Sequence, residues 1–271
     1  MHKLHLMVAV VGALASLPAW CQDAVEIEEN HALSLDLPTP HTDWAQPYAG
    51  GKTRVLFITN ARGTEPREAV ELMQRFDLDL QTVYWARIVD TTNEQWHGGE
   101  LGEKRVLRLL ERKWDCFVFF HVPLTNMSAQ QQYLLLKAVT EGAGLVFVGV
   151  DDKRVLKPIN QLKQIPTFLT PGPVGDAFLV GKGRALRLPH RPQIDYYEGW
   201  ETDYDCWQER LGRAVLWAAH KDPAADLGLE LSEPKLDRGA QAKVTVRLSG
   251  RLVGQKPLLH LSLRRGPDAP Y

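Results

Sequence analysis

Short, uninterrupted runs of apolar residues alternate with amphipathic segments through the middle of the chain, and this alternation constrains the fold more than any other feature. Residues 116–120 and 145–150 are two such runs, and each pattern predicts a buried strand. The segments at residues 66–76, 103–114 and 129–141 instead carry helical periodicity. A strand that is apolar on both sides has to be covered on both sides. The sequence therefore predicts an α/β fold, with a parallel sheet between two layers of helices.

Local signals define the individual elements. Ser128 followed by Gln131 forms a capping-box signature for the helix at residues 129–141, and Gly142 and Gly144 are natural stop signals after it. The expected apolar faces are Ala69, Val70, Met73 and Phe76 in the first helix, and Val106, Leu107, Leu110 and Trp114 in the second. The other expected elements are strands at residues 54–59 and 80–85, a hairpin of residues 177–180 and 184–188, and a helix at residues 204–221.

The N-terminal part of the chain predicts export. Residues 1–21 are briefly basic and then almost wholly apolar, and they end at a small-x-small pattern before Gln22, as in a secretory signal peptide. An uncleaved anchor and a lipidated Cys21 are the alternatives. Residues 22–52 are rich in Pro and Gly and predict an extended arm. We therefore expect a periplasmic, cell-envelope or secreted protein that touches a membrane only through its leader, if that is uncleaved.

The C-terminal part changes character. Residues 53–222 are expected to form the α/β domain, whereas residues 223–271 alternate apolar and polar positions between turn residues. Strands are expected at residues 227–231, 243–248 and 258–263, well short of the roughly seven of an immunoglobulin-like fold. The segment therefore predicts an incomplete β-sandwich. Its remaining strands would come from a partner or, as we favour, from a longer chain.

Charge and cysteine content exclude some classes of protein. The chain has 32 Lys and Arg against 33 Asp and Glu, and it carries no basic stripe with interleaved aromatic residues, so we expect no nucleic-acid partner. After removal of the leader, Cys116 and Cys206 remain, which are too few for a disulfide framework. Cys116 lies in a predicted buried strand and is expected to be an inert core thiol.

The strand at residues 145–150 arrives from the glycine-rich turn Gly142-Ala143-Gly144 and ends in Gly149-Val150-Asp151. In one large group of α/β enzymes a nucleophilic thiol occupies the third position of this Gly-x-Cys pattern. Here a carboxylate, Asp151, stands there, and a carboxylate cannot do thiol chemistry.

Several further motifs accompany this strand. They are Tyr48-Ala49-Gly50-Gly51-Lys52, Asn60-Ala61-Arg62-Gly63-Thr64, Trp114-Asp115-Cys116-Phe117-Val118-Phe119, Glu141-Gly142-Ala143-Gly144-Leu145-Val146, Gly181-Lys182-Gly183-Arg184 and Leu216-Trp217-Ala218-Ala219. Together they make residues 44–219 resemble the class I glutamine amidotransferase-like domains of large exported bacterial proteins, which are related to the trehalose-utilisation type and to the amidotransferase-like domain of some β-galactosidases. The resemblance implies a flavodoxin-like sheet. In active members it also implies a Cys-His-Glu triad beside an oxyanion hole.

The chain departs from this family pattern at two places. Asp151 replaces the thiol, and the family's His-Pro-Glu is echoed only by His190-Arg191-Pro192, which lacks the carboxylate. Without a thiolate no thioester forms, and without the carboxylate the imidazole is poorly oriented. We therefore expect no amide hydrolysis by the usual route.

Polar residues follow several of the predicted strands. In open parallel sheets, ligands bind beyond the carboxyl ends of the strands, near the point where strand order reverses. The candidate ligand-binding residues are Asn60, Arg62, His121 and Asp152, and the candidate catalytic residues are Asp151 and His190, the latter if its strand lies alongside. Asp151, Asp152 and His121 are suitable metal ligands, but caps and loop residues explain them more simply. We recognise no metal motif and expect no cofactor.

Two other groups of residues allow two interpretations each. Arg62 and Arg67 could hold an anion at a helix N-terminus, or they could pair with nearby glutamates on a solvated face, which we favour. Residues 196–201 with Tyr204 and Trp207 are aromatic and acidic, which suits sugar rings. A packed loop over the sheet is the alternative that we favour.

The sequence therefore predicts an exported, non-catalytic amidotransferase-like module of a larger cell-envelope protein, which binds a small molecule or glycan or contacts further domains. A hydrolase of carbohydrate-related substrates that uses Asp151 and His190 is the first alternative, and a structural spacer is the second.

Overall fold

The computed structural model describes residues 51–61, 65–88, 93–150, 161–162, 176–190, 200–222, 225–232, 239, 241 and 243–250. The predicted leader, residues 22–50 of the arm, the strand at residues 258–263, and Arg62, Asp151 and Asp152 lie outside the described residues.

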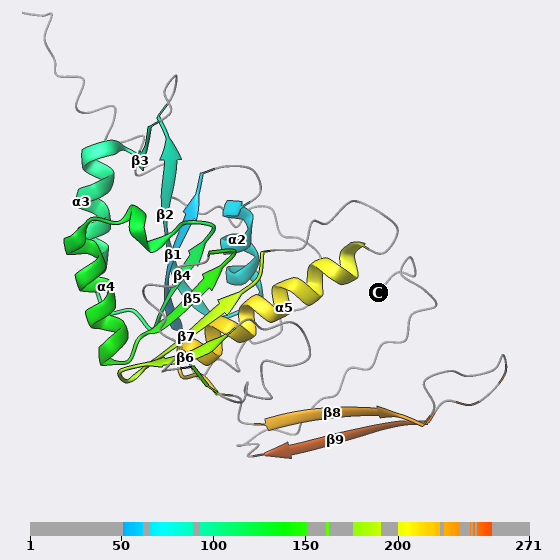
Figure 1. Ribbon diagram of the computed structural model, residues 1–271. Coiled ribbons are helices and arrows are strands. Elements are labelled where there is room, and N and C mark those ends of the chain that lie inside the picture. Colours follow the sequence, from blue (N-terminus) through cyan, green and yellow to red (C-terminus); the bar gives the residue numbers. More distant parts are fainter. Residues whose placement is uncertain are drawn as a thin grey trace, which may run out of the picture.

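A mixed seven-stranded sheet forms the centre of the domain (Figure 1), in the order β3-β2-β1-β4-β5-β7-β6. Five neighbouring strands, β2, β1, β4, β5 and β7, are parallel, and the two edge strands β3 and β6 are antiparallel to their neighbours. The strands are β1 Thr53–Asn60, β2 Leu78–Arg87, β3 Glu94–Trp96, β4 Cys116–Phe120, β5 Gly144–Val148, β6 Ala177–Val180 and β7 Gly183–Leu188. The expected α/β sheet is confirmed, but it is not parallel throughout.

Helices cover both faces of this sheet, as the continuous apolar strands predicted. Alternate residues of a strand point to opposite faces, so Val55 and Phe57 of β1 belong to one core while Leu56 and Ile58 belong to the other. The first core includes residues of helices α2 and α5, and the second includes residues of α3 and α4. The helices are α2 Glu65–Arg75, α3 Gly99–Leu110, α4 Ala129–Glu141 and α5 Trp200–Ala218, and a short 3₁₀ turn, η1, spans Leu124–Asn126.

Capping interactions determine where α4 begins. The Ser128 hydroxyl accepts a hydrogen bond from the Gln131 backbone N–H at 3.3 Å, and the Gln131 side chain accepts one from the Ser128 N–H at 3.0 Å. This is the predicted capping box, and the helix has the predicted bounds. By contrast, α3 ends at Leu110, so Trp114 does not share its apolar face. The Trp114 indole instead donates to the Leu109 carbonyl at 2.7 Å, buried against the end of the helix.

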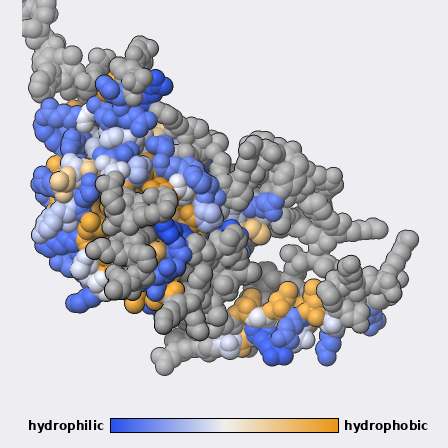
Figure 2. Space-filling view, in the orientation of Figure 1, coloured by the Kyte–Doolittle hydropathy of each residue, from blue (hydrophilic) through white to orange (hydrophobic). Residues whose placement is uncertain are grey.

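Strands β8 (Ala225–Leu231) and β9 (Val244–Gly250) form a separate antiparallel pair. Leu227, Leu229 and Leu231 lie opposite Leu248, Val246 and Val244, so one side of the hairpin is apolar. The leucines are 43–60% exposed (Figure 2, orange). Both strands were predicted. Within the part of the chain that the structure describes, this hairpin is all that represents the expected β-sandwich, and an immunoglobulin-like fold is not confirmed.

The start of β5 packs directly on the end of α5, which makes Gly144 a sensitive position. A Cβ on Gly144 would lie 2.5 Å from the backbone carbonyl of Ala218, which cannot swing aside as a side chain can. We expect Gly144→Ala to lower the free energy of unfolding by about 1–3 kcal/mol, as other overpacked cores do. Urea denaturation measures the change.

Gly228→Ala is the matched control for this substitution. A Cβ on Gly228 would have its nearest neighbours, both in Arg247, at 3.8 Å, which is ordinary van der Waals contact. Its unfolding free energy should stay within about 0.5 kcal/mol of the parent. Equal losses in the two variants would contradict the close approach of β5 and α5.

Candidate functional site

The candidate site lies at the carboxyl edge of the sheet, where strand order reverses between β1 and β4. The chain leaves β1 for β2 on one side and later enters β4 on the other side, and ligand sites favour such a point. Asn60 is the last residue of β1, and His121 directly follows β4. The Asn60 side-chain amide donates a hydrogen bond to the His121 carbonyl at 3.1 Å. The two sides of the reversal are therefore tied together.

His121 has an unusual backbone conformation for a residue other than glycine. Its φ is 56°, in the left-handed region, which costs on the order of 1 kcal/mol for an ordinary side chain. Its N–H donates to the Val148 carbonyl at 3.0 Å, so β5 and Asn60 together hold this conformation. The imidazole lies against Phe120, with ring centroids 4.6 Å apart.

Gly149, directly after β5, lets a second imidazole approach the first. His190 lies two residues beyond the end of β7, is exposed, and has its ring centroid 5.2 Å from that of His121. Gly149 has a φ of 63°, and a Cβ on it would lie 2.6 Å from His121 Nε2 and 2.6 Å from His190 Nδ1. Any larger residue would displace the two rings.

The structure thus brings together three of the six candidate residues. Asn60, His121 and His190 share one edge because β7 lies beside β5, which was the condition stated for His190. Arg62, Asp151 and Asp152 lie outside the described residues, and no contact can be assigned to them. Sequence analysis missed the role of Gly149. Its signal was the Gly-x-Asp at the end of an apolar strand.

Neither described thiol has the surroundings of an activated nucleophile. Cys116 begins β4, at the opposite end of that strand from His121, and is fully buried, which raises its pKa above the ordinary value. It is the core thiol that the sequence predicted. Cys206 is on α5, and partial burial, followed by the charges of Glu209, Asp203 and Asp205, also raises its pKa. A raised pKa lowers the fraction of reactive thiolate.

The predicted apolar face of α2 is partly wrong. Ala69 and Phe76 are buried, but Val70 and Met73 are only half-buried. The face that packs against α5 includes charged residues instead. Glu68, Glu71 and Arg75 recur at helical spacing and are each at most 1% exposed.

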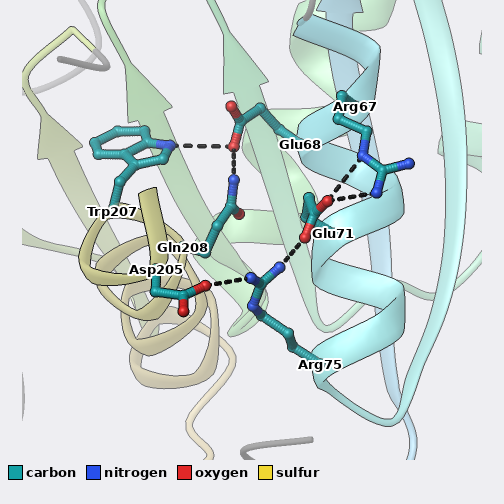
Figure 3. Close-up of polar contacts among 7 residues, drawn as sticks. All are labelled: Arg67, Glu68, Glu71, Arg75, Asp205, Trp207 and Gln208. Carbon is teal, nitrogen blue, oxygen red and sulfur yellow. Dashed lines mark hydrogen bonds and ion pairs between the residues drawn. The ribbon is translucent and has the colours of Figure 1, made fainter. Parts of the chain in front are cut away.

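These charges are buried because they pair with one another and with α5 (Figure 3). The Arg75 guanidinium binds the carboxylate of Glu71 and that of Asp205, the latter at 2.7 Å. Arg67 Nε donates to Glu71 at 2.8 Å. The predicted pairing of Arg67 with a nearby glutamate is confirmed, but Glu71 is buried rather than on a solvated face. The alternative was an anion held by Arg62 and Arg67. The pairing of Arg67 with Glu71 does not support it.

Trp207, a candidate sugar platform, is a core side chain. It is 1% exposed, its ring centroid lies 6.5 Å from that of Phe120, and its indole donates to Glu68 at 3.1 Å. Gln208 donates to the same carboxylate at 2.6 Å. Trp207 is therefore packed, as the favoured interpretation expected, and the sugar alternative is wrong for this residue, because the buried Glu68 carboxylate satisfies the only donor of its indole. Residues 196–199 lie outside the described residues.

The described residues contain no cluster of three or more metal-ligating side chains of His, Cys, Asp or Glu. Within the same part of the chain, every helix is too short or too polar to cross a bilayer. Comparison with protein-family models gives no match, and comparison with curated proteins gives none either.

Because Arg75 pairs with two carboxylates, we expect its replacement to lower the free energy of unfolding substantially. In an Arg75→Met variant, the buried Glu71 would lose one of its two arginine partners, and breaking a buried ion pair typically costs about 3–5 kcal/mol. We expect urea denaturation to show a loss near the lower end of that range, because Arg67 remains. Arg213→Met is the control. Its pair with Glu209 is partly exposed, and its loss should cost less than about 1 kcal/mol.

The same network predicts a pH dependence. Burial alone would raise the pKa of Glu71, but the charges and hydrogen bonds of Arg75 and Arg67 outweigh it and lower that pKa below its ordinary 4.5. A carboxyl whose pKa is lower in the folded state stabilises above its unfolded pKa, and the stabilisation is lost as pH falls through the folded pKa.

The unfolding free energies of the parent and of Glu71→Gln should therefore differ most near pH 7 and converge as pH falls from 5 to 3. Subtraction of one from the other cancels the titration of the remaining carboxyls. Urea midpoints across this pH range give the comparison. A difference that stays constant down to pH 3 would mean that Glu71 is not stabilised as a carboxylate.

Proposed function

We propose that residues 53–222 form a ligand-binding module of amidotransferase-like ancestry that does not hydrolyse amides. The observation that carries the proposal is the convergence of Asn60, His121 and His190 at the carboxyl edge of the sheet, around a glycine whose missing side chain lets the two imidazoles approach each other. Residues in strained backbone conformations cluster at functional sites, and His121 combines such a conformation with a place at the edge of the sheet.

The strand order supports the ancestry. Along the chain, the parallel strands are second, first, third, fourth and fifth across the sheet, which is the flavodoxin-like order. This order, together with the motifs in residues 44–219, favours a class I glutamine amidotransferase-like domain. The partial β-sandwich that we propose for residues 223–271 begins with the β8–β9 hairpin.

The surroundings of the two thiols argue against amide hydrolysis. The amidotransferase route to amide hydrolysis needs a thiolate next to an imidazole, and Cys116 lies at the wrong end of its strand. Partial burial, and then the acidic neighbours of Cys206, raise the pKa of its thiol and so disfavour the thiolate. Binding without thioester chemistry is therefore the simpler use of an edge that presents an amide and two imidazoles.

The ligand that suits this edge is a small polar molecule or a glycan. Imidazoles and an amide offer hydrogen-bond donors and acceptors without a fixed charge, which fits hydroxyl and amide groups. From residues 1–21 we propose that the module is exported and works in the cell envelope, as part of a larger protein.

A ligand panel tests this function. The chain should gain thermal stability from at least one glycan or polar metabolite in a panel screened with a chelator present. His121→Asn should weaken its affinity at least tenfold, because asparagine tolerates the left-handed backbone but removes the ring. Calorimetric titration measures this.

His220→Asn is the control for that substitution. His220 is exposed, has a φ of 58° and follows the end of α5, so its replacement should leave affinity unchanged. If no compound stabilises the chain, the spacer interpretation replaces the proposal. If a bound compound is turned over, and Asp151→Asn stops turnover but not binding, the protein is a hydrolase.

A further inference from the structure

A nitrogen of His121 and a nitrogen of His190 both lie close to Gly149, and this arrangement indicates which kind of ligand the edge can bind. His121 Nε2 and His190 Nδ1 each lie 2.6 Å from the position that a Gly149 Cβ would occupy. His121 Cδ2 lies closer still to that position, at 2.4 Å, so both rings close on the glycine and their two nitrogens are at most 5.2 Å apart. The rings belong to different strand ends, after β4 and after β7, which lie on either side of β5.

The separation of the rings matches that of two imidazoles on one metal ion. Each nitrogen would lie about 2 Å from a zinc ion, so two imidazoles in a tetrahedral shell have ring centroids about 5 Å apart. The observed centroid separation is 5.2 Å, with the planes inclined at 42°. An inclination of this size lets both nitrogens point toward a common position more readily than parallel stacking does.

We propose that His121 and His190 bind one divalent transition-metal ion at the carboxyl edge of the sheet. The inference rests on the proposed function, because it names a ligand of the same site. Neutral imidazole nitrogens are ligands for Zn²⁺, Ni²⁺ and Cu²⁺. The sequence alone favoured no metal here, because caps and loop residues explained Asp151, Asp152 and His121 more simply and no metal motif was present.

Two protein ligands define the kind of metal site. Structural zinc sites use four protein ligands and catalytic sites three, whereas the described residues supply two here. Water or an oxygen of a polar ligand would complete the coordination that these two imidazoles begin. The ion is exchangeable, and its affinity should rise from Zn²⁺ or Ni²⁺ to Cu²⁺.

The Asn60 side chain prepares this arrangement without touching the ion. Its amide donates to the His121 carbonyl at 3.1 Å and thereby supports the left-handed backbone that turns the imidazole toward His190. Asn60 is thus a positioning residue. Its replacement by alanine should weaken metal affinity less than replacement of either histidine.

Metal titration of the full chain, freed of any affinity tag and of bound metal, tests the inference. With ZnCl₂ or NiCl₂ and no organic ligand present, calorimetry should show that each chain binds one metal ion through these histidines. His121→Asn and His190→Asn should each weaken that binding at least tenfold, whereas His220→Asn should change it less than twofold. Affinity should also fall as pH is lowered from 7.5 to 5.5, because protons compete for the same nitrogens.

His190 is exposed and follows the sheet, so His190→Asn keeps the test valid if His121→Asn disturbs folding. Absence of binding, or equal binding by His190→Asn and the parent, would overturn the metal site. The ligand panel contains a chelator and therefore tests organic ligands without metal. If an organic ligand binds in the panel but the metal titration shows no binding, the proposed function stands and only the metal site is wrong. If the metal ion binds but no compound in the panel does, the proposal of an organic ligand is wrong and the metal site is supported.

Discussion

Burial of the central strands on both faces is the constraint on which the rest of the structure depends. β1, β4 and β5 alternate side chains between two separate cores, and neither core can be left in water. Helices must therefore cover both faces, and consecutive parallel strands require crossovers between them. Parallel direction in turn brings the ends of β1, β4, β5 and β7 to one edge. The candidate site is a consequence of that shared direction.

The helix layer shows how charge can be buried in such a fold. α2 and α5 pack through Arg75, which binds Glu71 on its own helix and Asp205 on the other, while Glu68 accepts from Trp207 and Gln208. Each of these buried charged side chains has hydrogen-bonding or charged partners in the folded structure, which is the condition under which buried ions are tolerated. The network leaves these groups engaged in packing rather than in binding a ligand.

The carboxyl edge has the opposite character. His121 adopts a left-handed conformation, supported by hydrogen bonds with Asn60 and Val148, and the lack of a side chain at Gly149 lets its ring approach that of His190. Hydrogen bonds to and from the backbone of His121 hold the site, and the two imidazole rings lie with their centroids 5.2 Å apart. A site of this kind can bind without a nucleophile. That agrees with the proposed amidotransferase-like ancestry, in which Asp151 would stand where active members carry a thiol.

Periodicity and caps were sufficient to predict several elements in this chain, including α4 and β4 with their bounds, the β6–β7 hairpin, and the two helix layers. They failed for β3, which is three residues long, and they missed the charged part of the α2 face, where Glu68 and Arg75 are buried. Local sequence determines where a helix or strand begins and which residues are apolar. Only tertiary structure decides which distant side chains become partners, because His190 meets His121, and Arg75 meets Asp205, solely through strand order and helix packing.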